Sequence, residues 1–141
     1  MTSPHQATCV AIERRALLIE GPPGSGKSSL ALALLDRGAV LVGDDGVLLD
    51  PRYGVLHVRP HPETRGLIEV RNVGLIGRPA IDAAPAALVV VLDREAPRYV
   101  EQAESCERAG VALPLIRLWP DSPVLALRAE AALARYGLGA G

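Results

Sequence analysis

The apolar residues of this chain fall into short runs separated by turns rich in Gly, Pro and Asp, which is typical of β-strands. Residues 87–92 are apolar without interruption, as in a strand buried on both faces, whereas residues 67–71 alternate apolar and charged side chains. Two pairs of runs, joined at 13–14 and at 50–54, predict hairpins. The strands expected are residues 8–13, 15–20, 39–42, 47–49, 55–58, 67–71, 87–92 and 111–119.

Two segments have the apolar spacing of a helix. The first, residues 27–37, follows a glycine-rich segment, and Gly38 suits the C′ position at which many helices end. The second is expected to have Ser122 as its N-cap and Pro123 at its first helical position, and to end at Tyr136.

Irregular segments are expected at residues 59–66 and 79–85, where prolines interrupt the pattern, and residues 93–110 fit either a helix or a hairpin. Strands outnumber helices and do not alternate strictly with them. The sequence therefore predicts an α/β fold with a mixed, partly antiparallel sheet. At 141 residues the chain is expected to form one domain, 1–141, in which residues 137–141 are a frayed tail.

Charge and composition argue against several classes of partner. The net charge is −1 and no stripe of basic and aromatic residues is present, so nucleic acid is not an expected partner. The apolar stretches are too short to span a membrane, and the first residues lack the features of a signal peptide. Cys9 and Cys106 are expected to be buried thiols in a reducing environment, which predicts a cytoplasmic protein.

A glycine-rich loop before the first helix carries a specific chemical signal. Residues 21–28 have the pattern G-x-x-x-x-G-K-[ST], which binds the phosphates of a nucleoside triphosphate when a strand precedes it and a helix follows. Its glycines let backbone N–H groups approach the phosphates, Lys27 supplies positive charge, and the Ser28 hydroxyl can bind Mg²⁺. A turn that only caps a helix would not need every fixed position. The residues expected to bind ATP are Gly21, Pro22, Pro23, Gly24, Ser25, Gly26, Lys27, Ser28 and Ser29.

Three acidic residues could complete this site. Asp44 and Asp45 follow an expected strand, where carboxylates can reach a γ-phosphate and its metal ion. Glu69 is the central charge of the alternating strand and could bind Mg²⁺. Each has a simpler interpretation, because acidic residues are common in turns and Glu69 and Arg71 could face solvent. His5 carries no specific signal by itself.

Together these residues resemble the catalytic domain of HPr kinase/phosphorylase, a bacterial enzyme that modifies a serine of the phosphocarrier protein HPr. The resemblance covers about residues 4–76. It includes His5, the loop at 21–28, the strand and acids at 41–45, and residues 65–76. The last segment is similar to the family's signature, a Leu-x-Glu-[Ile/Val]-Arg core followed by Gly-[Ile/Leu]-Ile.

The resemblance implies a P-loop fold of the phosphoenolpyruvate-carboxykinase type, with ATP and Mg²⁺ as cofactors. The loop would hold the triphosphate, and Asp44 would be the general base that takes the proton from the target serine hydroxyl. His5 would lie near the nucleotide, and Arg71 would help to organise the site. The catalytic residues expected are His5, Lys27, Asp44 and Arg71, and the metal ligands expected are Ser28, Asp45 and Glu69.

The expected function is an ATP-dependent protein serine kinase that phosphorylates HPr or a related phosphocarrier of the phosphotransferase system, and so regulates carbon metabolism. Two alternatives stay open, a small-molecule P-loop kinase and a non-catalytic nucleotide-binding regulator. The sequence shows no counterpart of the family's additional N-terminal domain or of its C-terminal Pro-Gly-Arg-Asn segment. We therefore expect kinase activity to exceed any phosphorylase activity, and a monomer or small homo-oligomer instead of a hexamer.

Overall fold

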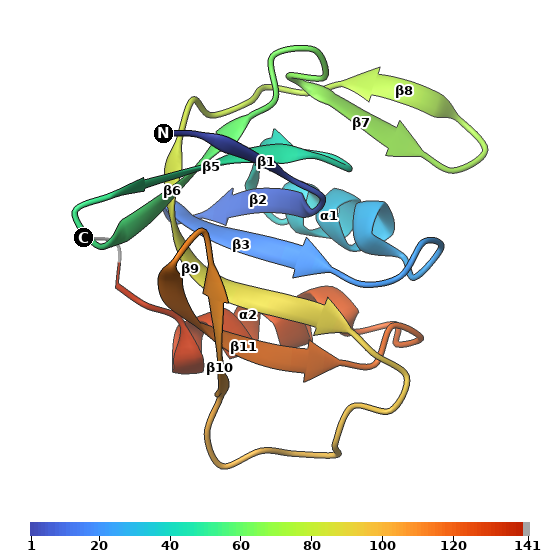
Figure 1. The fold of residues 1–141 in the computed structure, drawn as a ribbon. Helices are drawn as coiled ribbons and strands as arrows, with labels where there is room; N and C mark the ends of the chain where they lie inside the picture. The colour runs from blue at the N-terminus through green and yellow to red at the C-terminus, as the bar shows by residue number, and fades with distance from the viewer. Residues whose placement is uncertain (140–141) are drawn as a thin grey trace.

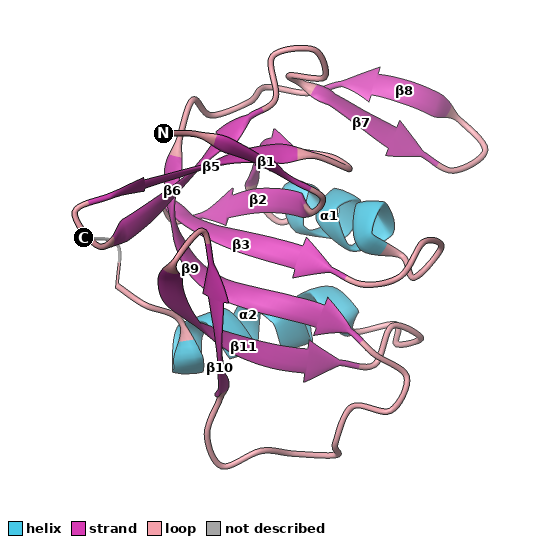
Figure 2. Ribbon diagram, viewed as in Figure 1, coloured by secondary structure: helices cyan, strands magenta, loops and turns pink. Residues whose placement is uncertain are grey.

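Strands make up most of the regular structure of this protein (Figures 1 and 2). The computed structural model describes residues 1–139, so the last two residues of the expected domain and tail lie outside the described part of the chain. The elements in chain order are β1 (Ser3–His5), β2 (Thr8–Ile12), β3 (Arg15–Glu20), α1 (Lys27–Asp36), β4 (Val40–Gly43), β5 (Val47–Arg52), β6 (Val55–Pro60), β7 (Leu67–Val70), β8 (Gly74–Gly77), β9 (Ala84–Leu92), β10 (Glu104–Arg108), β11 (Val111–Leu118) and α2 (Leu125–Tyr136).

The main sheet is mixed, and its centre is parallel. β9 pairs in parallel with β3 on one side and with β11 on the other, so the arrowheads of all three point the same way (Figure 1). The other strand pairings are antiparallel, including β2 between β3 and β4 and the β5–β6 hairpin. β7 and β8 form a separate two-stranded hairpin. The mixed, partly antiparallel sheet that the sequence predicts is confirmed.

The central strands are buried on both faces. In β3, Leu17 and Ile19 pack with the two helices in one apolar cluster, whereas Ala16 and Leu18 pack with residues of β5 and β6 in another. Side chains alternate between the two faces along a strand, so a sheet that is covered on both sides needs apolar residues at successive positions. This explains the uninterrupted apolar runs. Figure 2 shows α1 and α2 on the same side of the sheet.

The turn expected at residues 50–54 is shorter in the structure. β5 extends to Arg52, and Tyr53 and Gly54 alone make the turn, both with positive φ. Asp50 is fully buried in β5, where Arg52 and Arg59 each place a guanidinium nitrogen 3.0 Å from its Oδ2. Burial alone would raise the pKa of Asp50, but the hydrogen bonds from Arg59 and Arg52 lower it. A buried carboxylate with two cationic partners therefore replaces the expected turn residue.

Two expected loops are also shorter. β9 begins at Ala84, within the segment expected to be a loop up to residue 85, and Pro85 lies opposite His57 of β6. Proline is tolerated near the start of a strand, where its missing N–H costs little. β6 continues to Pro60, so the loop expected from residue 59 begins later.

In the C-terminal third, α2 starts later than expected, and the choice between a helix and a hairpin at residues 93–110 is resolved in part. α2 begins at Leu125, and Ser122 is not its N-cap, because the Ser122 hydroxyl instead accepts the N–H of Val124 (3.2 Å) in a preceding turn. Residues 93–110 contain β10, which forms a hairpin with β11, so the hairpin interpretation is correct for their second half. Strands β1 and β8 were not expected.

The sequence analysis expected both cysteines to be buried thiols and no segment long enough to span a membrane. Cys9 is buried and Cys106 half-buried, and both are free. Burial raises the pKa of both thiols. Within residues 1–139, no helix combines the length and apolar character needed to cross a membrane.

Candidate functional site

The glycine-rich loop connects the carboxyl end of β3 to the N-terminus of α1. Gly26 is the N-cap residue of α1 and has a φ of 101°, and Gly24 has a φ of 77°, a region that side chains with a Cβ seldom adopt. A Cβ at either position would meet nothing within 4 Å, so the backbone there is open to a ligand. The loop thus presents backbone N–H groups at a helix N-terminus, which is a favourable position for an anion.

Lys27 lies at the start of α1 with its ammonium group folded back over the loop. Its Nζ donates hydrogen bonds to the carbonyl oxygens of Gly21 (2.9 Å) and Pro22 (3.2 Å). The positive charge is therefore held at the start of the loop. Lys27 is also the single lysine of the chain.

Asp44 joins four elements at the carboxyl end of β4. Its Oδ1 accepts hydrogen bonds from the hydroxyls of Ser28 (2.6 Å) and Thr8 (3.1 Å), and its Oδ2 accepts the backbone N–H of Glu69 (2.8 Å). The side chain is buried, and these donors come from α1, β2 and β7. Asp45 is exposed instead, with a φ of 57°, and its N–H donates to the Thr8 hydroxyl (3.3 Å). The adjacent acids therefore occupy different environments.

A cavity of about 550 Å³ lies between the loop, β4 and the β7–β8 hairpin. Of the residues expected in the site, the structure brings ten to its lining and leaves four outside. Those on the lining are Pro23, Gly24, Gly26, Lys27, Ser28, Ser29, Asp44, Asp45, Glu69 and Arg71. Those outside it are His5, Gly21, Pro22 and Ser25.

The alternating strand faces the cavity as its pattern suggests. In β7, Ile68 is fully buried, and Val70 packs against the same apolar cluster as α1. Glu69, between them, is exposed and lies on the cavity lining, as does Arg71. The sequence could not show that the backbone of Glu69 also holds Asp44.

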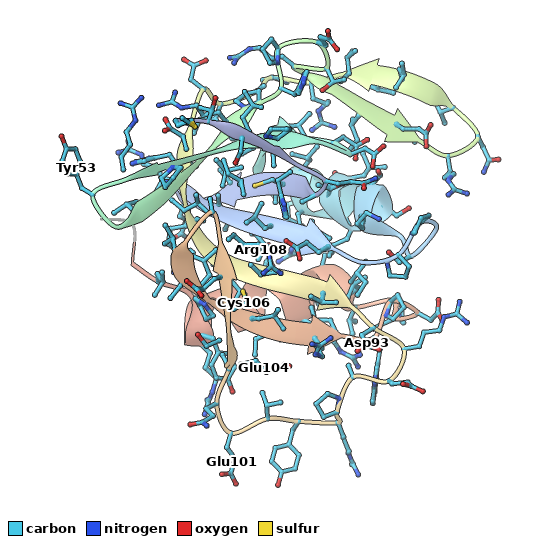
Figure 3. The ribbon with its side chains drawn as sticks, in the orientation of Figure 1. Tyr53, Asp93, Glu101, Glu104, Cys106 and Arg108 are labelled. Atoms are coloured by element: carbon cyan, nitrogen blue, oxygen red, sulfur yellow. The ribbon has the colours of Figure 1, made fainter. Side chains whose placement is uncertain are left out.

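Glu20, the last residue of β3, forms a network behind the loop. Its Oε2 lies 2.8 Å from His5 Nε2, and Arg108 of β10, labelled in Figure 3, donates to both carboxylate oxygens at 2.9 and 2.7 Å. Burial alone would raise the pKa of Glu20, but the hydrogen bonds and charges of His5 and Arg108 lower it to about 2. The network ties β1 and β10 to the residue that precedes Gly21.

This network predicts a pH dependence of stability. The pKa of Glu20 falls from its ordinary value of 4.5 to about 2 on folding, so its contribution is complete above pH 4.5 and is lost as the pH falls towards 2. We expect the difference in free energy of unfolding between wild type and Glu20→Gln to shrink over this range. Denaturant titrations at several pH values measure it. The control is Glu107→Gln, which removes an exposed carboxylate from β10, the strand that carries Arg108. A pH-independent difference between wild type and Glu20→Gln would contradict the prediction.

Gly43 closes β4 directly before Asp44 and predicts a second effect on stability. A Cβ at Gly43 would lie 2.6 Å from the carbonyl oxygen of Gly46 and 2.8 Å from Val47 Cγ1, so the turn that carries Asp44 would have to move. We expect Gly43→Ala to lower the free energy of unfolding by about 1–3 kcal/mol, as overpacking does. In Gly46→Ala the new Cβ meets nothing within 4 Å, so this variant is the control. Equal denaturation midpoints for the two variants would show that the turn adapts.

The sequence did not indicate three residues of the hydrogen-bond networks at Asp44 and Glu20, nor Thr64, Leu67 and Leu75 of the cavity lining. Thr8, Glu20 and Arg108 looked like ordinary strand or surface residues. Thr8 lies near Asp44 because β2 also pairs antiparallel with β4, which brings its first residue close to the carboxyl end of β4. The hairpin expected from the sequence joins residues 8–13 to residues 15–20 and does not predict that pairing. Arg108 lay in the segment that fitted either a helix or a hairpin, so its partner could not be inferred.

The side chains around the cavity fit Mg²⁺ bound together with a nucleotide. Within residues 1–139, no group of three or more His, Cys, Asp and Glu side chains is arranged to hold a metal by itself. Mg²⁺ usually keeps several waters and takes one or two protein oxygens together with substrate phosphates. Ser28 and Glu69 place such oxygen groups on the same cavity as the loop.

Comparisons with known proteins agree with this geometry. A family model described as HPr Serine kinase C-terminal domain matches residues 2–81. The HPr kinase/phosphorylase of Streptococcus pneumoniae is 36% identical over 115 residues, which are 72% of this chain and 37% of that protein. The enzyme of the same name from Mycoplasmopsis pulmonis is 44% identical over 70 residues, which are 49% of this chain and 22% of that protein. The chain therefore spans well under half the length of these curated relatives.

A solved structure supports the fold. The Hpr(Ser) kinase/phosphatase from Coxiella burnetii superposes with a TM-score of 0.83 at 24% sequence identity, and the match covers 94% of each chain. The expected P-loop fold is thereby confirmed. Since the family model also covers more than half of the sequence, this chain belongs to the HPr Serine kinase C-terminal domain family.

Proposed function

We propose that this chain is an ATP-dependent protein serine kinase whose acceptor is HPr or a related phosphocarrier of the phosphotransferase system. One observation carries the proposal, the 2.6 Å hydrogen bond from Ser28 of the loop to the buried Asp44. It joins a phosphate-binding loop to a carboxylate on one cavity, which is the arrangement that phosphoryl transfer requires. The names of the relatives, HPr kinase/phosphorylase, supply the class of acceptor.

The binding residues follow from the loop and the cavity. The backbone N–H groups of residue 21 and of residues 24–29 would hold the phosphates of ATP, with Pro22 and Pro23, which have no N–H, completing the loop. Lys27 would place its charge beside the β- and γ-phosphates. Ser28 and Glu69 would be ligands of Mg²⁺, with Asp45 as a further oxygen donor. The bound ion would neutralise phosphate charge. His5 would act indirectly, through its hydrogen bond to Glu20, the residue that precedes the loop.

Asp44 would act as the base for the acceptor hydroxyl. A carboxylate offers about four lone-pair directions, and three are used by the hydrogen bonds from Ser28, Thr8 and the backbone of Glu69. The remaining one, on Oδ2, can accept a hydrogen bond from an incoming serine. Three fixed donors also hold the carboxylate in place, and positioning is the main requirement of this reaction. Arg71, on the same cavity, would contribute positive charge.

A panel of acceptors tests this proposal. The protein, labelled ATP and Mg²⁺ are incubated with HPr-like carriers and, separately, with small molecules that carry hydroxyl groups, and mass spectrometry locates the phosphate. Phosphoserine on a carrier is the expected result. Phosphate on a small molecule would favour a small-molecule kinase, and nucleotide binding without transfer would favour a non-catalytic regulator.

We further propose that transfer to the carrier is faster than the reverse attack of inorganic phosphate on the phosphoserine. The reverse reaction needs a second anion beside the phosphoserine, and therefore additional positive charge. Among the described residues, the cations on the cavity lining are Lys27 and Arg71. Pyrophosphate release from a phosphoserine carrier in excess phosphate, compared with the forward rate, measures the ratio. Equal rates would contradict this prediction.

Three broader expectations also remain proposals. The chain would act as one domain, as a monomer or small homo-oligomer, and in the cytoplasm. Light scattering of the purified protein tests the second of these, and a hexameric mass would contradict it.

A further inference from the structure

A second cavity, of about 500 Å³, lies on the other side of the loop. Pro23 and Gly24 line both cavities, whereas Pro22 and Ser25 line the second cavity only. The loop thus separates the two spaces and is shared by them. Of the nine loop positions that the sequence assigned to ATP, four line the first cavity only, two line the second only and two line both. The acids Asp44, Asp45 and Glu69 all lie on the first cavity.

The second cavity lies at the carboxyl ends of the parallel strands. Asp93 and Arg94 follow β9, and Asp121 follows β11, all on the edge of the sheet at which β3 enters the loop. Figure 1 shows the arrowheads of β3, β9 and β11 along this edge, and Figure 3 labels Asp93 there. In α/β sheets, ligands bind outside the carboxyl ends of the strands, where the order of connections reverses. Here the chain leaves β3 through the loop towards β4, and β9 and β11 lie on the opposite side.

The direction of phosphoryl transfer favours one occupant for this cavity. The attacking and leaving oxygens lie roughly in line on opposite sides of the γ-phosphate. If the acceptor serine enters the first cavity beside Asp44, the leaving oxygen and the rest of the nucleotide must extend away from that side. With the β-phosphate held by the loop, the nucleoside would extend beyond the loop, and the second cavity lies on that side.

We propose that the second cavity holds the ribose and base of the ATP whose γ-phosphate lies beside Asp44, a proposal that rests on the function proposed above. The rings of Pro22, Pro23 and Pro120 offer apolar faces to a planar base. Arg94 and Asp121 form an exposed pair on the cavity lining, with Nε and Oδ2 3.7 Å apart, and they offer a donor and an acceptor to ribose hydroxyls and base edges. Small-molecule sites commonly combine apolar walls with a few polar groups in this way.

Asp93 is fixed and less available to a ligand. Its Oδ1 accepts the N–H of Glu95 (2.8 Å), and its Oδ2 accepts a hydrogen bond from Arg117 (3.3 Å). Arg117 is also held by Glu104 of β10 (2.8 Å). These contacts tie Asp93, at the start of the loop that carries Arg94, to β11, the strand that leads to Asp121.

Calorimetry with two ligands separates the nucleoside from the phosphates. Wild-type protein is titrated with Mg²⁺ and ATP, and separately with Mg²⁺ and inorganic tripolyphosphate, which lacks the nucleoside. We expect ATP to bind more tightly, and the double variant Arg94→Ala/Asp121→Ala to lose about tenfold or more in ATP affinity while tripolyphosphate affinity stays unchanged. Arg98→Ala is the matched control, an exposed arginine of the same loop that does not line the cavity.

The outcomes distinguish this proposal from the proposed function. Equal affinities for ATP and tripolyphosphate, or equal losses for both ligands in the double variant, would overturn the nucleoside site and leave the phosphate loop intact. Failure of the wild-type protein to bind either ligand would instead overturn the proposed function, and the nucleoside site with it.

A spectroscopic signal gives an independent measurement. Trp119 is the single tryptophan and directly precedes Pro120 of the cavity lining, and its indole N–H donates to the Ala96 carbonyl oxygen (2.6 Å). We expect Mg²⁺ and ATP to change the fluorescence of Trp119 much more than Mg²⁺ and tripolyphosphate do. The same change with both ligands would contradict the proposal.

Discussion

Lys27→Ala is expected to abolish detectable ATP-dependent phosphorylation while leaving the fold intact. In the structure the ammonium group contacts only the carbonyl oxygens of Gly21 and Pro22 among the described residues, and it contributes to no ion pair there. Its charge is therefore available to the triphosphate and is dispensable for the core. A circular dichroism spectrum close to that of wild type, together with no detectable transfer, is the expected result. Near-normal transfer by the variant would remove the basis for the phosphate-binding loop.

The composition of the chain allows a second measurement on the same residue without a mutation. Because Lys27 is the single lysine, an amine-selective reagent can label only Lys27 and the N-terminal amine of Met1. We expect Mg²⁺ and ATP to protect Lys27, while labelling at Met1 is unchanged and serves as an internal control. Labelling of Lys27 at the same rate with and without nucleotide would contradict its proposed role.

Asp44→Asn is expected to reduce transfer by roughly a hundredfold or more, the scale for losing a positioned base. Nucleotide affinity should change only a few-fold, because the hydroxyls of Ser28 and Thr8 can rotate to accept hydrogen bonds from the new amide. Both the fold and the loop would then persist. Transfer by single turnover, with nucleotide affinity measured in parallel, separates the two effects.

Glu69→Gln is the matched comparison for Asp44→Asn, since each replaces one carboxylate on the same cavity by an amide. Glu69 is exposed, and the hydrogen bond that it donates to Asp44 comes from its backbone, so this substitution leaves Asp44 in place. We expect a higher requirement for Mg²⁺, because a neutral amide is a weaker ligand for a hard cation. If both variants respond in the same way to a Mg²⁺ titration, the assignment of one acid as base and the other as metal ligand is wrong.

The elements next to the loop could be predicted because local signals and packing agree there. The strand before the loop is apolar on both faces, the loop contains glycine where φ is positive, and α1 starts at Lys27 as expected. The same holds for β7, where the buried Ile68 fixes which face Glu69 presents. In each case the residues that define the element also define its surroundings.

The misplaced boundaries share one physical cause, which is tertiary contact that overrides a local preference. Asp50 and Pro51 favour turns, yet β5 continues through them because Arg52 and Arg59 neutralise the buried carboxylate of Asp50. Ser122 is a favourable N-cap residue by type, but its hydroxyl accepts the N–H of Val124 in a turn that precedes the helix, and Val124 is the N-cap. No pattern within either segment contains the information that decides these cases.

In the site, too, local motifs could be predicted from the sequence and long-range partners could not. The loop and the acids were found as motifs, because each motif has its chemistry within a few residues. The partners of Asp44 and Glu20 come from strands far away in the sequence, so the roles of Thr8 and Arg108 became visible only when the sheet brought them together. The second cavity also depends on β9 lying between β3 and β11, which the sequence did not establish.

The central claim is that this cavity transfers the γ-phosphate of ATP to a serine hydroxyl of an HPr-like carrier. The most direct measurement follows γ-labelled ATP with wild type, Lys27→Ala and Asp44→Asn under identical conditions, and counts phosphoserine formed on the carrier against ADP produced. The account predicts one phosphoserine per ADP for wild type, none for Lys27→Ala, and a rate lower by roughly a hundredfold or more for Asp44→Asn. Release of the label only as inorganic phosphate, or equal rates for wild type and Asp44→Asn, would contradict it.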